Sequence, residues 1–147
     1  MGRNGLLGEF RNTASIRANV QMFRQSVERN IEQAAKKSAP QSGQRGKSLS
    51  KTFSDRLAYD VTLAGPQMLP IGNGYLKCRA TCNIDIAPGG TAYTATCGLV
   101  FSMQDRFEKP LDIHDTGRFE GEIVFGTPYT IIARWSEAIS IRPTRIN

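Results

Sequence analysis

The sequence lacks the short motifs of several large enzyme classes. Its 147 residues include only one histidine. They contain no nucleophile elbow, no phosphate-binding P-loop, no paired-histidine zinc motif and no dinucleotide-binding fingerprint. Nucleophile-elbow hydrolases, P-loop nucleoside triphosphatases, zinc proteases of that type and Rossmann dehydrogenases therefore have no support in this sequence.

Long apolar runs are also missing. No stretch approaches the roughly 20 apolar residues that a membrane-spanning helix needs. Residues 1–17 have no long apolar core, so they do not resemble a secretory signal peptide. If the protein acts outside the cytoplasm, we expect another apparatus or a larger parent chain to carry it there.

The positive charge is concentrated in the first part of the chain. The formal net charge of the whole chain is +6. Residues 1–60 contain 11 Lys and Arg against 5 Asp and Glu, whereas residues 61–147 contain 8 of each. This excess favours an anionic partner, such as a nucleic acid, a lipid surface or an acidic protein. It is equally compatible with a solvated helix and linker.

An amphipathic helix is predicted over residues 15–38. Apolar residues recur there at spacings of three and four, which places them on one stripe: Ile16, Val20, Phe23, Val27, Ile31 and Ala34. Ser15 is the expected N-cap, and Pro40 closes the far end. The stripe is expected to pack on a sheet or a partner, although a basic amphipathic helix can also lie on a membrane.

A polar linker is predicted after this helix. Residues 38–52 are rich in Ser, Gly and Lys, and they separate the helix from a β-rich body. We therefore divide the chain into residues 1–52, the basic helix and its linker, and residues 53–147, a β-rich domain that is expected to be catalytic.

A β-hairpin is the clearest pattern in the chain. Even positions from Leu76 to Ile86 are apolar or small, and a second run from Thr91 to Asp105 has its apolar residues at odd positions. Such alternation predicts strands with one buried face. A two-residue turn at 89–90 sets a register in which paired residue numbers sum to 179. This register pairs apolar with apolar: Ile86 with Tyr93, Cys82 with Cys97, Ala80 with Leu99 and Cys78 with Phe101.

Three further strands are predicted, at Tyr129–Trp135, Ala138–Arg142 and Tyr59–Leu63. With the hairpin they suggest a curved, half-barrel-like antiparallel sheet against which the N-terminal amphipathic helix packs, an α+β fold. The cysteines fall on the buried face of the hairpin, where they fit small buried side chains. Cys82 and Cys97 face each other in this register and would form a disulfide in an oxidising compartment.

Residues 102–122 hold six acidic residues and the only histidine. Asp105 has the parity of the buried face, and Pro110 then ends the strand, which leaves His114 in a loop. Carboxylates can hold a divalent metal or activate water, a histidine can transfer a proton, and an arginine can hold a phosphate. One interpretation of this segment is a solvated loop. As a catalytic site, this set of residues suits hydrolysis of a phosphoester or a pyrophosphate better than acyl transfer.

The same stretch resembles the catalytic segment of colicin M-type bacteriocins. These antibacterial toxins cleave the polyprenyl–pyrophosphate linkage of lipid II, a peptidoglycan precursor. The resemblance rests on Asp105-Arg106-Phe107-Glu108, on His114 nine residues after Asp105, and on Gly126-Thr127-Pro128-Tyr129. It covers roughly residues 75–135. The family has a tyrosine where this chain has Phe107 and a second aspartate where it has Glu108.

The resemblance implies a magnesium-dependent hydrolase. Asp105 and Glu108 would hold the magnesium ion, and His114 would assist proton transfer. Arg118 would stabilise charge on the phosphate, because this chain has Asp115 where the family has an arginine. The implied substrate is lipid-linked and anionic, at a membrane surface in the periplasm of a target cell. An immunity protein is an implied partner of such a secreted effector.

Two alternatives remain open. A nucleic-acid-cleaving toxin would use the same carboxylates, metal and histidine, and its basic helix would follow phosphates. A non-enzymatic structural or interaction module, such as a structural protein of a phage or secretion particle, would use the acidic loop only as a binding epitope.

Overall fold

The computed structural model describes residues 5–107 and 129–147. Two helices precede four strands, and the order along the chain is α1 (Gly5–Asn12), α2 (Ala14–Ser38), β1 (Lys47–Asp60), β2 (Asn73–Ile86), β3 (Ala92–Phe107) and β4 (Tyr129–Arg145). The strands form one antiparallel sheet in the order β1-β2-β3-β4. The predicted α+β fold, an N-terminal helix with a curved antiparallel sheet that does not close, is confirmed.

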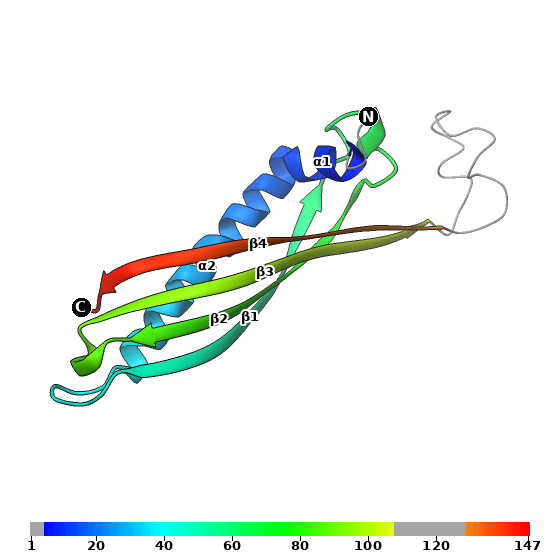
Figure 1. Ribbon diagram of the computed structural model, residues 1–147. Helices are drawn as coiled ribbons and strands as arrows, with labels where there is room; N and C mark the ends of the chain where they lie inside the picture. Colours follow the sequence, from blue (N-terminus) through cyan, green and yellow to red (C-terminus); the bar gives the residue numbers. More distant parts are fainter. Residues whose placement is uncertain (1–4, 108–128) are drawn as a thin grey trace.

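The long helix lies diagonally across one face of the sheet (Figure 1). Of the predicted stripe, Ile16, Phe23, Val27 and Ile31 are buried, whereas Val20 and Ala34 are only partly buried. Ala35 is buried as well, and the buried apolar residues of the helix and sheet form one hydrophobic core. Phe23 meets Phe101 of β3 edge to face, with ring centroids 5.8 Å apart. The predicted boundary between residues 52 and 53 falls inside β1. No helix in the described part of the chain is long and apolar enough to cross a membrane.

The predicted N-cap of the long helix is wrong. The cap is Thr13, whose hydroxyl accepts a hydrogen bond from the Ile16 N–H at 3.3 Å. Ser15 lies within the helix, and its hydroxyl accepts from the Asp60 N–H at 3.0 Å. Helix α1 was not predicted, since Gly5 and Gly8 weaken its helix propensity. Burial of Phe10 against Tyr59 and Trp135 holds this short helix in place.

The predicted register of the hairpin is confirmed. Ile86 pairs with Tyr93, Cys82 with Cys97, Ala80 with Leu99 and Cys78 with Phe101. The turn is longer than two residues, because Pro88 has no N–H to continue the ladder and starts a short 3-10 turn. Both turn glycines have positive φ, 76° at Gly89 and 69° at Gly90, a conformation that glycine adopts without strain.

The other strands differ from the prediction. The segment 47–52 is the start of β1 rather than a linker, and β1 ends at Asp60, so the strand predicted over Tyr59–Leu63 is wrong. Its inward positions alternate between partly buried apolar residues and the exposed Lys51 and Asp55, which hides the period of two. The two strands predicted after residue 129 are one continuous strand, β4.

The central strands are joined covalently. A disulfide links Cys82 of β2 to Cys97 of β3 in the core, so these two residues are more than the small buried side chains that were the first expectation. Cys78 is buried and has a free thiol.

Candidate functional site

The predicted catalytic residues lie in the sequence at the end of β3 and after it. The backbone of Asp105 lies in β3, where it pairs with Ile131 of β4. Its side chain, together with Glu108, His114 and Arg118, lies outside the described residues. The magnesium site at Asp105 and Glu108 therefore stays a prediction. Among the side chains that the structure describes, no group of three or more His, Cys, Asp or Glu residues is placed to hold a metal ion.

The described part of the chain offers a different candidate, the open face of the sheet. Side chains alternate across each strand, so the residues between the buried positions point away from α2. Arg56 of β1 pairs with Lys77 of β2, Lys77 with Ser102 of β3, and Ser102 with Arg134 of β4. These four residues form one row across the whole sheet, and the three basic ones are exposed.

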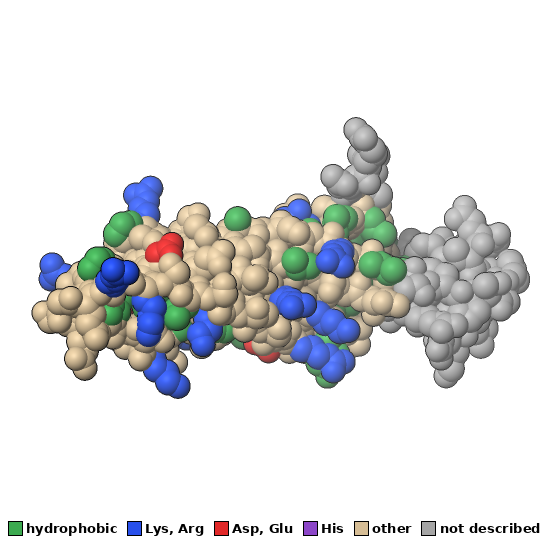
Figure 2. Space-filling view, turned by 60° about the horizontal axis from the view of Figure 1, so that its bottom comes forward, with side chains coloured by type: hydrophobic (Ala, Val, Ile, Leu, Met, Phe, Trp, Pro, Cys, Tyr) green, Lys and Arg blue, Asp and Glu red, His purple; other side chains and the backbone are tan. Residues whose placement is uncertain are grey.

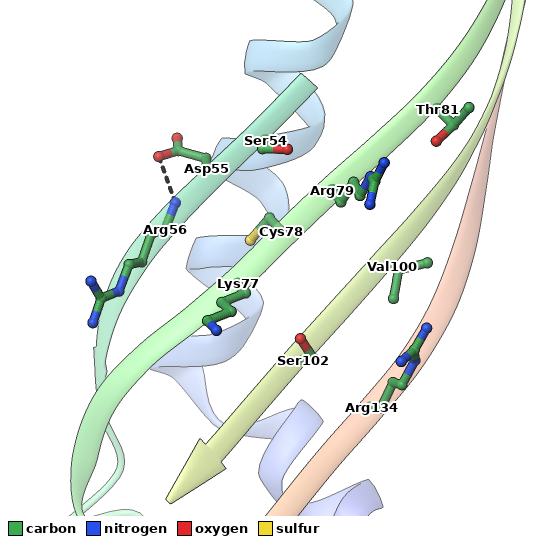
Figure 3. Close-up of a pocket in the computed structure, with 10 residues that line it drawn as sticks. All are labelled: Ser54, Asp55, Arg56, Lys77, Cys78, Arg79, Thr81, Val100, Ser102 and Arg134. Carbon is green, nitrogen blue, oxygen red and sulfur yellow. Dashed lines mark hydrogen bonds between the residues drawn. The ribbon is translucent and has the colours of Figure 1, made fainter. Parts of the chain in front are cut away.

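A fourth cation adjoins this row. Arg79 stands two residues from Lys77 on the same face of β2, between Ser54 and Val100 on the neighbouring strands. We call Arg56, Lys77, Arg79 and Arg134 the cationic patch. The patch lines an open depression of about 750 Å³, and Figure 3 shows its side chains rising from β1, β2 and β4 with the helix behind the sheet.

The positive charge of the patch is not neutralised by neighbouring carboxylates. Among the residues that the structure describes, none of Lys77, Arg79 and Arg134 forms an ion pair. Asp55 borders the depression but has the parity of the inner face, and its carboxylate accepts a hydrogen bond from the Arg56 backbone N–H at 2.7 Å. The space-filling view shows many Lys and Arg side chains and few Asp and Glu on the side it presents (Figure 2).

Other carboxylates of the described residues have partners elsewhere. Glu137 accepts hydrogen bonds from Arg24 and from the Trp135 indole, both at 3.0 Å, and lies 3.8 Å from Arg11. Asp85, at the far end of β2, accepts a hydrogen bond from the Ser48 hydroxyl at 2.6 Å. Since these groups are engaged away from the patch, its field remains positive.

An aromatic ring stands beside the patch. The Arg56 guanidinium lies over the ring of Tyr75, 4.1 Å from its centroid. Tyr75 and Ile132 line a second depression, next to that of the patch. Tyr75 is 53% exposed and Ile132 is 67% exposed. Tyr75 therefore presents a ring to solvent next to the row of cations.

The rest of the open face carries mainly hydroxyl groups. Short polar side chains follow one another along the strands: Ser48, Ser50, Thr52, Ser54, Thr81, Thr94, Thr96, Ser136 and Ser140. Some are tied across strands, as where the Ser50 hydroxyl lies 3.0 Å from the Asn83 side-chain oxygen. Such a surface offers many hydrogen-bond donors and acceptors and little apolar area.

The free thiol under this sheet is chemically quiet. Burial, with a smaller contribution from the Asp55 carboxylate, raises the pKa of Cys78 to about 12. Its sulfur lies 3.7 Å from the Leu76 carbonyl oxygen, to which it donates. Since the thiolate is the reactive form, this residue is not a nucleophile at neutral pH.

The cationic patch was not predicted from the sequence. The alternation on residues 76–86 identified Lys77 and Arg79 as exposed, but gave them no role. Arg56 and Arg134 carry no signal in the sequence, because only strand pairing brings them into line with Lys77.

No family model, no curated protein and no solved structure matches this chain. The resemblance to colicin M-type bacteriocins stays a prediction that rests on its short motif.

Proposed function

We propose that this protein is a non-enzymatic structural or interaction module that holds an anionic partner on the open face of its sheet. The observation that carries the proposal is the cationic patch, whose four basic side chains lie on an uncovered face without an opposing set of carboxylates. Small-molecule sites are usually concave and mostly apolar. An open surface lined by cations and hydroxyl groups suits an extended partner better.

The open edges of the sheet support a role within a larger assembly. In the part of the chain that the structure describes, β1 pairs only with β2, and β4 pairs only with β3. Each edge therefore presents a long row of backbone N–H and C=O groups, which proteins commonly cover with another chain or element. The disulfide favours an oxidising compartment, since disulfides are rare in the cytosol.

The experiment for the proposal compares two sets of neutralised cations. The variant Lys77→Gln/Arg79→Gln/Arg134→Gln removes three charges from the patch. The control Arg29→Gln/Lys36→Gln/Lys37→Gln removes three from exposed positions of α2, on the other face of the sheet. The expected result on a heparin column is elution of the patch variant at a clearly lower salt concentration than the control. Elution of both variants at the same salt concentration would overturn the proposal.

A second candidate function is the predicted metal-dependent hydrolysis of lipid II. One observation favours it: Arg134 of the patch and its strand partner Ser102 lie on β4 and β3, the two strands between which residues 108–128 connect in the sequence, and that segment holds the predicted catalytic loop. A basic surface there would attract a pyrophosphate. Magnesium-dependent turnover of lipid II that disappears in His114→Ala would replace the first proposal with this one. Cleavage of plasmid DNA or RNA instead would favour the nuclease alternative.

A further inference from the structure

The open face carries two kinds of group side by side, cations in a row and an exposed aromatic ring. From this pairing we infer that the anionic partner is a single-stranded nucleic acid. The inference rests on the proposed function, because it names the partner of the same face. The phosphates would lie along the cationic patch, and a base would stack on Tyr75.

The spacing of the row suits a chain of phosphates. Arg56, Lys77 and Arg134 stand on strands one, two and four of the sheet. Because neighbouring strands are about 4.8 Å apart, the row extends over roughly 14 Å. A polyanion with charges distributed along its length can contact all three cations, whereas a single small anion cannot.

The groups between the cations suit phosphate oxygens. Guanidinium groups bind phosphates with two parallel hydrogen bonds, and the patch has three of them, at Arg56, Arg79 and Arg134. The hydroxyl of Ser102 lies in the row itself, and the hydroxyls of Ser54 and Thr81 line the same depression. Hydroxyl side chains are common donors to nucleic-acid backbones.

Tyr75 distinguishes a single strand from other anions. Unpaired bases stack on exposed aromatic side chains, and an arginine packed on the ring adds to that platform. Tyr75 is half exposed and already holds the Arg56 guanidinium against its ring. An acidic peptide would use the cations but has no need of the ring. A duplex offers no free base face on which the ring could stack, because its bases are paired and stacked on one another.

A membrane fits this face less well. Interfacial binding draws on buried apolar area as well as on charge. The open face has exposed large apolar or aromatic side chains only at Tyr75 and Ile132 among the described residues, and hydroxyl groups cover most of the remainder.

The test measures fluorescence anisotropy of a labelled oligo(dT) of about 20 nucleotides on the full chain. The same oligonucleotide in a duplex, phosphatidylglycerol vesicles and polyglutamate serve as competitors. The single strand is expected to bind most tightly. For Lys77→Gln/Arg79→Gln/Arg134→Gln we expect binding weaker by about tenfold or more. The slope of log affinity against log salt should fall by roughly 2, since each phosphate contact to a single strand contributes about 0.7.

Substitutions of Tyr75 provide the second part of the test. Tyr75→Ala is expected to weaken binding of the single strand by about fivefold or more, because one stacked base contributes about 1–3 kcal/mol. Tyr75→Phe, which keeps the ring, should bind like the unaltered protein, and duplex affinity should not depend on residue 75. Thermal unfolding of each variant shows whether the fold is intact.

Three outcomes would overturn the inference. They are no binding of the single strand at low salt, equal weakening by the α2 control variant, and tighter binding of vesicles or polyglutamate. If heparin retention depends on the patch but oligo(dT) binding does not, the nucleic-acid inference fails and the proposed function stands. If heparin retention is also independent of the patch, both fail.

Discussion

The two faces of the sheet are built from the same strands but differ in burial and in role. On the inner face, Leu99, Phe101 and Leu76 are fully buried against the helix and its neighbours. On the outer face, Lys77, Val100 and Ser102 alternate with them in the sequence and remain accessible. A period of two thus lets one strand contribute to folding with every second residue and to recognition with the others.

The largest effect is expected from the inner face. Phe101→Ala should lower the free energy of unfolding by about 3–5 kcal/mol, because it opens a cavity between Phe23 and Trp135, the rings that Phe101 touches. Val100→Ala, one residue away on the open face, should cost less than about 1 kcal/mol. Urea denaturation followed by circular dichroism measures both, and equal costs would contradict the division of the two faces.

The second largest effect is expected from removal of the disulfide. Cys82→Ala/Cys97→Ala removes a cross-link between residues 15 positions apart in the sequence, which is expected to cost about 3 kcal/mol. Thermal unfolding with and without dithiothreitol provides the matched control. Reductant should lower the Tm of the unaltered protein and leave that of the double variant unchanged. A reductant-insensitive Tm in the unaltered protein would count against the bond.

The pH dependence of stability tests the burial of Cys78 on the inner face. Its folded pKa is raised to about 12, so the thiol stabilises the fold fully below the unfolded pKa of about 8.5. That contribution is lost as the pH rises from there toward 12, because the unfolded chain releases its proton first. Unfolding measured from pH 8 to 11 should show a steeper loss than in Cys78→Ala. At pH 8 a thiol-specific disulfide reagent should modify Cys78 only after denaturation, and rapid modification of the native protein would contradict its burial.

The smallest effect is expected from a carboxylate next to the cationic patch. Asp55 has the parity of the inner face, but it neighbours Arg56 on the edge strand β1 and borders the depression, so Asp55→Asn should strengthen anion binding by at most about fivefold, the range of an exposed charge. Glu28→Gln on α2 changes the net charge equally and is the control. Heparin elution and oligonucleotide anisotropy report the effect, and an equal shift in both variants would show that only total charge matters.

Local pattern predicted the parts of the fold whose signals are contiguous. The hairpin of β2 and β3 follows from alternation on both sides of a glycine turn, and α2 follows from its apolar spacing. The start of β1 was not predicted, since the Ser- and Lys-rich stretch from Lys47 resembles a loop until β2 pairs with it. The continuity of β4 was not predicted for the same reason. Its polar residues Ser136 and Glu137 resemble a break between two strands until they pair with β3.

By itself, then, the sequence determined the helix, the central hairpin and its register, because each depends on a short-range period and on turn chemistry. Only the tertiary structure decided that Arg56, Lys77 and Arg134 stand in one row. These residues are far apart along the chain, and hydrogen bonding between strands is the physical link that aligns them. The acidic segment remains a prediction of the sequence, and its test is the turnover assay with His114→Ala.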